Sequence, residues 1–148
     1  MPYKSSEKWD VHTHTTLSPA TFDTLGKYAS RYTDFVRIKA HDCKPCCAHM
    51  INANGDILRE IEDDAYSAET RLKDCDRHDV TMQVISPTPM MIPDFVENDH
   101  DAATICKILN DDNAALVAKF PQRFTALGAL PMLHTKPAIK ELHRIKSL

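Results

Sequence analysis

The sequence lacks any stretch of about 18 apolar residues, the length that a membrane-spanning helix needs. Its start, MPYKSSEKWD, also lacks the apolar segment of a secretory signal, so we expect a cytoplasmic protein without a membrane partner. Positive charge is not in excess, because 18 Lys and Arg stand against 21 Asp and Glu. Since neutralising phosphates requires clustered positive charge, nucleic acid is excluded as a partner.

Glycine is scarce, at three residues, and neither a Gly-rich phosphate loop nor a nucleophile-elbow sequence occurs. Nucleotide use and serine hydrolysis therefore have no support. The five cysteines are an odd number in a chain without a secretory signal, so we expect reduced thiols rather than a disulfide framework. A chain of 148 residues can bury a core, and we take residues 1–148 as one unit.

Strand-like and helical patterns alternate along most of the chain. β-Branched or apolar stretches predict strands at 9–11, 80–85 and 124–130. Apolar residues at helical spacing predict helices over 68–78, with Ser67 as the N-cap, over 101–120, and from 137 onward. Residues 21–64 are irregular apart from alternating stretches at 35–40 and 57–61, and we interpret about 20–65 as an antiparallel insertion.

This alternation of strand and helix predicts an α/β fold, because right-handed βαβ units build a parallel sheet. Three units cannot close an eight-stranded barrel. The chain is therefore either the first part of a (β/α)8 barrel or a small open α/β domain.

His12 and His14 are the sharpest candidates for chemistry. They stand at the end of a predicted buried strand, where side chains two residues apart point to the same face. Both imidazoles can then bind one divalent ion, and in a barrel they would lie at the carboxyl-terminal mouth. The alternative, two surface histidines in a loop, is equally compatible with the spacing.

Arg59 has a functional and a plain interpretation. A guanidinium can hold a substrate carboxylate through two parallel charge-assisted hydrogen bonds. Beside Glu60 and Glu62, however, the residue alone is better read as a solvated strand arginine.

A second group of potential metal ligands lies within the predicted insertion. Its Cys-x-x-Cys spacing suits half of a structural zinc site, and flanking histidines could complete it. Such a stretch is more often only the connection between two strands. The residues are His41, Cys43, Cys46, Cys47 and His49.

Four segments together resemble consecutive blocks of one family, the α-amino-β-carboxymuconate-ε-semialdehyde decarboxylases and their amidohydrolase-related decarboxylase relatives. Their order and approximate spacing match from Trp9 to the final helix, and the block ending in GALPM is the most specific. The segments are WDVHTH, ILREIEDDAY, RLKDCDRHDVTMQVISPTPMM and ICKILNDDNAALVAKFPQRFTALGALPM.

The resemblance implies a distorted eight-stranded α/β barrel (TIM barrel) with a small β insertion and one Zn²⁺ at its mouth. His12 and His14 match the zinc ligands of the first strand. Arg59 matches the arginine that binds a substrate carboxylate, although Tyr66 replaces the tryptophan that follows it in the family. The remaining ligands and the catalytic histidine come from later strands, so we expect an amino-terminal part of a barrel without a catalytic residue of its own. No role is assigned to His78, His100, His134 or His143.

The implied activity is zinc-dependent, non-oxidative decarboxylation of a small carboxylic acid, aminocarboxymuconate semialdehyde, in the kynurenine pathway of tryptophan catabolism, diverting it from quinolinate. We expect the 148 residues alone to be inactive, and we leave open whether they form a homodimer. Two alternatives remain. One is a related decarboxylase or hydrolase acting on a hydroxybenzoate-like acid, and the other is a non-enzymatic zinc-binding module at His41 to His49.

Overall fold

The computed structural model describes residues 7–148 and contains two three-stranded sheets. Sheet β1-β5-β6 is parallel and sheet β2-β3-β4 is antiparallel, which confirms the predicted α/β class with a small antiparallel insertion. The elements are β1 (Trp9–Thr15), α1 (Pro19–Ala29), β2 (Arg37–Ala40), β3 (Cys47–Ile51), β4 (Ile57–Glu62), the 3-10 turn η1 (Asp63–Ala65), α2 (Ala68–Arg77), β5 (Met82–Pro87), the 3-10 turn η2 (Pro89–Met91), α3 (Asp99–Lys119), β6 (Phe124–Ala126) and α4 (Thr135–Ile145).

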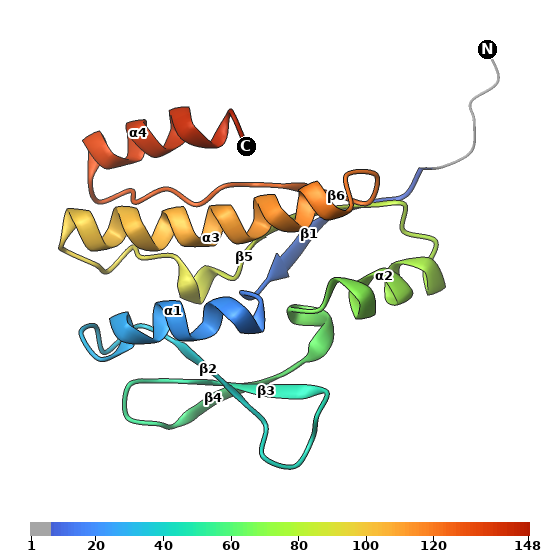
Figure 1. Cartoon of the computed structure of the whole chain (residues 1–148), viewed down its shortest axis with the longest axis horizontal. Coiled ribbons are helices and arrows are strands. Elements are labelled where there is room, and N and C mark those ends of the chain that lie inside the picture. The colour runs from blue at the N-terminus through green and yellow to red at the C-terminus, as the bar shows by residue number, and fades with distance from the viewer. Residues whose placement is uncertain (1–6) are drawn as a thin grey trace.

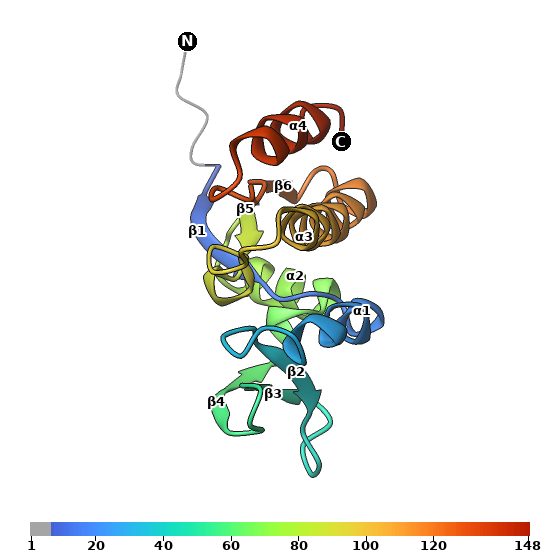
Figure 2. The same ribbon diagram turned by 90° about the vertical axis from the view of Figure 1, so that its left-hand side faces the viewer.

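Helices α2 and α3 lie on one side of the parallel sheet (Figure 2). Ile85 of β5 and Phe124 of β6 pack there against Ala68 and neighbouring apolar side chains of both helices. The opposite side of the sheet is more open. Val11 of β1 is 67% exposed, so the prediction of a buried first strand was wrong, because the helices cover only the other face.

Helices α2 and α3 each begin after a residue whose side chain satisfies a free backbone N–H group. Ser67 accepts a hydrogen bond from the backbone of Thr70 at the start of α2, as the sequence predicts. Asn98 does the same for Asp101, so α3 begins two residues before the predicted start at 101.

Helix α1 and strand β3 occupy parts of the segment 21–64 that the sequence analysis described as irregular. Pro19 stands in the first turn of α1, where its missing N–H group costs nothing. Leu25 and Tyr28 enter the largest core cluster, together with Ile105 and Leu109 of α3. The helix is anchored by this tertiary packing more than by its local pattern, which Gly26 interrupts.

The antiparallel sheet and α4 lie at opposite ends of the molecule (Figure 1). Val36, Ala48, Met50 and Ile61 form a small core of their own within this sheet, next to Tyr66. Through η1 the chain passes from β4 directly into α2, so the sheet sits beside the carboxyl end of β1. In the part of the chain that the structure describes, none of the helices combines the length and apolar character required to cross a membrane.

Candidate metal and substrate site

Strand β1 brings the rings of His12 and His14 side by side. Their centroids are 5.3 Å apart and the ring planes are nearly perpendicular, at 86°. His14 pairs with Ser86 of β5, whereas Thr13 pairs with Ile85, which points into the helix-covered core. Because side chains alternate along a strand, His14 projects from the opposite, open face. His12 is exposed and His14 is half-buried.

The donor set of this pair fits a divalent ion, since two neutral imidazoles are suitable ligands for Zn²⁺ and for other first-row metals. Within residues 7–148, no third His, Cys, Asp or Glu joins the two histidines in a group at metal-ligand spacing. A catalytic zinc normally takes three protein ligands. The described residues thus offer two of the ligands that such a site would need.

His14 is held through its ring and its backbone. The distance from its Nδ1 to Ser86 Oγ is 2.8 Å, and its carbonyl oxygen accepts a hydrogen bond of 2.9 Å from Arg71. Arg71 also donates to Thr13 Oγ1 at 2.7 Å. These contacts fix the end of β1 to both β5 and α2.

Arg71 is a functional candidate that the sequence analysis missed. Its side chain is buried, and burial lowers the pKa of its guanidinium, an effect that the nearby charges of Asp64 and Asp10 oppose. The signal was present in the helical pattern. Arg71 lies on the same buried stripe of α2 as Ala68 and Cys75, and a charged residue on an apolar stripe calls for a partner or a role.

Arg59 lies on β4 and lines the same cleft as His14. The cleft has a volume of about 690 Å³ and lies between the antiparallel sheet and the carboxyl ends of β1 and β5. Arg71, Glu62 and Asp64 also line it. Arg59 is exposed, so its guanidinium is accessible to a ligand in this cleft. Forty-five positions of sequence separate Arg59 from His14, and the fold brings them to one opening.

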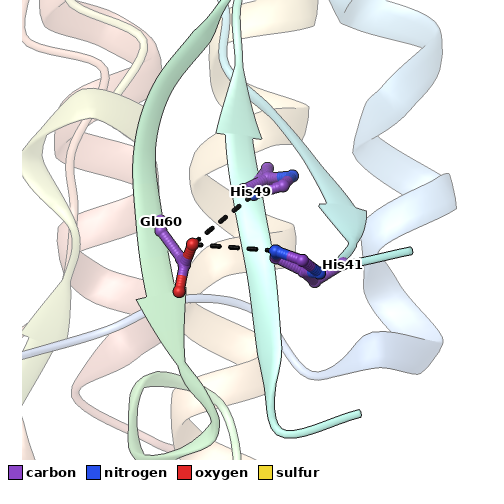
Figure 3. A group of neighbouring side chains, drawn as sticks. All are labelled: His41, His49 and Glu60. Carbon is purple, nitrogen blue, oxygen red and sulfur yellow. Dashed lines mark ion pairs between the residues drawn. The ribbon is translucent and has the colours of Figure 1, made fainter. Parts of the chain in front are cut away.

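The His41 and His49 side chains of the insertion converge on Glu60 (Figure 3). Each Nε2 lies near Glu60 Oε2, at 3.7 Å for His41 and 3.8 Å for His49. Lys44 also donates a hydrogen bond of 2.7 Å to this carboxylate. By ligand type and spacing, the three side chains are suited to a metal ion.

The hydrogen bonds of His41 nevertheless favour a neutral imidazole with its proton towards Glu60 over a metal ion at this cluster. His41 Nδ1 accepts the backbone N–H groups of Cys43 and Lys44, both at 3.0 Å. A neutral imidazole that accepts at Nδ1 carries its proton on Nε2, the atom that faces Glu60. For a metal to bind Nε2, the proton would have to move to Nδ1, and both hydrogen bonds that Nδ1 accepts from the backbone would then be lost.

The cysteines of the insertion stand apart from this histidine pair. Cys46 and Cys47 contact each other, with their sulfur atoms 3.1 Å apart, and that hydrogen bond, helped by burial, raises the pKa of Cys47 to about 11. Cys43 is exposed. The structure therefore does not gather all five residues of the predicted cluster around one point.

The other histidines lie away from the cleft. His134 contacts the carbonyl oxygen of Val96 at 2.9 Å, while His78, His100 and His143 are exposed. None of the four lines the opening shared by His14 and Arg59.

Two curated proteins resemble this chain over nearly its whole length. The 2-amino-3-carboxymuconate-6-semialdehyde decarboxylase of Dictyostelium discoideum is 36% identical over 139 residues, which cover 94% of this chain and 37% of that protein. The protein of the same name from Caenorhabditis elegans is 32% identical over 135 residues, covering 91% and 32% respectively. The chain thus spans about a third of the length of these relatives. No family model matches it.

Solved structures show the same fold. The apo form of the IDCase of Metarhizium anisopliae superposes with a TM-score of 0.72 at 18% identity, covering 97% of this chain and 40% of that one. A dihydroxybenzoic acid decarboxylase from Polaromonas sp. JS666, solved with manganese and the inhibitor 2-nitroresorcinol, gives a TM-score of 0.62 at 18% identity, covering 94% and 34%. These superpositions confirm the predicted fold, the first part of an α/β barrel.

Proposed function

We propose that this chain, which is related in sequence along more than nine-tenths of its length to the 2-amino-3-carboxymuconate-6-semialdehyde decarboxylases, supplies the first metal ligands and a carboxylate anchor of a metal-dependent decarboxylase. The observation that carries the proposal is the shared cleft. Two neighbouring imidazoles stand at the end of a parallel strand, and an exposed guanidinium opens into the same space as one of them. A metal site beside a carboxylate anchor is the arrangement that a decarboxylase of this kind requires.

In the proposed site, His12 and His14 bind a divalent ion, for which we take Zn²⁺ as the resident metal. When bound, the ion supplies Lewis-acid polarisation of the substrate. Arg59 holds the acid through charge-assisted hydrogen bonds and orients it relative to the histidines. Arg71 keeps the backbone of His14 in place through its hydrogen bond to the carbonyl oxygen.

The substrate we propose is aminocarboxymuconate semialdehyde, an acid of tryptophan catabolism, because both curated relatives carry that name. The second candidate is a hydroxybenzoate-like acid. It is supported by the fold shared with a dihydroxybenzoic acid decarboxylase, a similarity that reaches only 18% identity. The zinc-binding module at His41 to His49 is disfavoured by the hydrogen bonds that His41 Nδ1 accepts.

Metal binding tests the proposal directly. Zn²⁺ and Mn²⁺ are titrated into the 148-residue chain in competition with a chromophoric chelator. We expect His12→Ala and His14→Ala each to weaken binding about tenfold or more, since each removes one of two ligands. His49→Ala is the matched control and should leave the affinity unchanged. Binding that survives both β1 variants and is lost in His49→Ala and Cys43→Ala would instead support the zinc-binding module.

Acid binding and turnover complete the test. Arg59→Gln should weaken binding of 2,6-dihydroxybenzoate, used as a carboxylate probe, by about tenfold or more, with Arg59→Lys in between. Because the pair of histidines is one ligand short of a catalytic zinc site, we expect no decarboxylation of the semialdehyde by the 148 residues alone. Zinc-dependent turnover by this chain that His12→Ala abolishes would contradict that expectation.

A further inference from the structure

Ser86 contacts one of the two ring nitrogens of His14, Nδ1. The distance from Ser86 Oγ to His14 Nδ1 is 2.8 Å, and in principle either atom could donate the hydrogen bond. Ser86 Oγ also lies 3.4 Å from the carbonyl oxygen of Thr13, to which it can only donate. The Thr13 contact is the longer of the two, so the proposed metal binding sets the assignment: a neutral imidazole that binds a divalent ion through Nε2 carries its proton on Nδ1. Ser86 Oγ accepts the hydrogen bond from that N–H group while its own hydroxyl proton points to Thr13. His14 then carries its proton on Nδ1 and presents an unprotonated Nε2.

The pairing of His14 with Ser86 depends on an irregularity in the sheet. Asp10 pairs with Gln83 and Thr13 pairs with Ile85, so three steps along β1 correspond to two along β5. Without this bulge, His14 would stand opposite Pro87, which has neither a side-chain donor nor an acceptor. Arg71 holds the same segment of β1 through Thr13 Oγ1 and the His14 carbonyl oxygen, so the shifted register is fixed from the helix side as well.

We propose that Ser86 is a positioning residue that selects the Nδ1–H tautomer of His14 and thereby offers Nε2 to the divalent ion. The part of this inference that concerns metal affinity rests on the proposed function, whereas the dependence of the His14 tautomer on Ser86 can be tested without it. Which nitrogen of a histidine binds a metal is set by the hydrogen bond that the other nitrogen makes, and partners of this kind are commonly worth about 10–100-fold in metal affinity.

The tautomer can be measured without any metal. Long-range ¹H–¹⁵N correlation spectra of the ¹⁵N-histidine-labelled 148-residue chain are recorded at increasing pH until the His14 signals no longer change, so that the neutral imidazole is observed. We expect a protonated Nδ1 and an unprotonated Nε2 for His14 in the wild type. Ser86→Ala should shift His14 toward the Nε2–H form, and Ser86→Thr, which keeps a hydroxyl, should retain the wild-type form.

Metal affinity is the second measurement. Ser86→Ala should weaken Zn²⁺ binding about tenfold, whereas Ser86→Thr should bind nearly as the wild type does. Thr88→Val is the matched control, because Thr88 donates to the carbonyl of Thr15 on the same strand end. It should change neither the His14 tautomer nor the affinity. Circular dichroism of each variant checks that the fold is retained.

Two outcomes overturn the inference: an unchanged His14 tautomer in Ser86→Ala, or, where His14→Ala does weaken Zn²⁺ binding, a changed tautomer with unchanged Zn²⁺ affinity. Failure of the proposed function looks different. In that case His14→Ala binds Zn²⁺ as well as the wild type does, while the dependence of the tautomer on Ser86, seen without metal, still supports the positioning role.

Discussion

Single residues in this chain stabilise the fold through contacts with residues that are distant in sequence. Asp101, in the first turn of α3, accepts a hydrogen bond of 2.7 Å from Tyr32 Oη and forms an ion pair with Arg31, both just beyond α1. The hydrogen bond from Tyr32, assisted by Arg31, holds the pKa of Asp101 below its usual value, against the opposing effect of burial. One carboxylate thus ties the end of α1 to the start of α3.

Replacing Asp101 with Asn should therefore destabilise the fold in a pH-dependent way. Near neutral pH we expect a loss of about 1–2 kcal/mol, because the charge-assisted bonds are weakened. The folded pKa lies below the unfolded value of about 3.9, so the stabilisation is fully present above that value and is lost as the pH falls through the folded pKa.

Urea unfolding of the wild type and of Asp101→Asn from pH 7 downward measures this difference. The two proteins should converge only below about pH 4. The matched control is Asp99→Asn, an exposed change of the same charge in the same helical turn. A pH-independent difference for Asp101→Asn would show that the carboxylate charge does not carry the effect.

At the scale of the elements, buried polar side chains decide how helices join strands. Asn110 of α3 accepts the backbone N–H of Ala129 at 2.7 Å and donates to its carbonyl oxygen at 2.9 Å and to Glu141 Oε1 at 2.7 Å. Through this one amide, α3 holds both the segment after β6 and helix α4. The sequence analysis took the stretch around Asn110 as an ordinary amphipathic helix, since an asparagine shows no partner until the segments pack.

Removal of this amide should loosen α4. Asn110→Ala takes the side-chain partner from the backbone N–H and carbonyl groups of Ala129 and one of the hydrogen bonds from Glu141, which keeps its bonds to Arg144. We expect a loss of about 2–3 kcal/mol in the free energy of unfolding. Hydrogen exchange should show the largest loss of protection in residues 129–145. Asn54→Ala, in the exposed turn between β3 and β4, should change stability by less than about 0.5 kcal/mol. Equal losses of stability in Asn110→Ala and Asn54→Ala would show that Asn110 does not hold α4 in place.

For the whole molecule, the exposed edges of the parallel sheet are the dominant feature. Val11 on β1 is 67% exposed, and Leu127, which directly follows β6, is 58% exposed; β1 and β6 are the outer strands of the order β1-β5-β6. The segment between β6 and α4 adds further exposed apolar side chains, Met132 and Leu133. Exposed edge strands with apolar surface favour pairing with other chains.

We expect the 148-residue chain to self-associate through these edges as its concentration rises. In sedimentation velocity experiments, the double change Val11→Lys with Leu127→Lys should shift the chain toward the monomer, because two charges replace apolar contacts. Ile57→Lys is the matched control, since Ile57 is 60% exposed on β4, in the antiparallel sheet at the other end of the molecule. Association that only Ile57→Lys disrupts would place the interface on the antiparallel sheet instead.

The sequence by itself determined what depends on local periodicity and local chemistry. The alternation of three strands with helices, the N-cap at Ser67 and the common face of His12 and His14 follow from repeats of 3.6 and 2 residues and from short-range hydrogen bonds. Helix α1 was missed because its stability comes from packing against α3, which a local pattern does not contain.

Only the tertiary structure decided which distant residues meet. The cleft shared by His14 and Arg59 depends on where the antiparallel sheet docks beside the barrel strands. The contact of His14 with Ser86, 72 residues away, depends on a one-residue bulge in the register of β1 against β5. Register is a property of two paired strands, so neither strand's sequence specifies it alone. For that reason the pairing of His12 with His14 could be predicted from the sequence, while the residues that hold the pair could not.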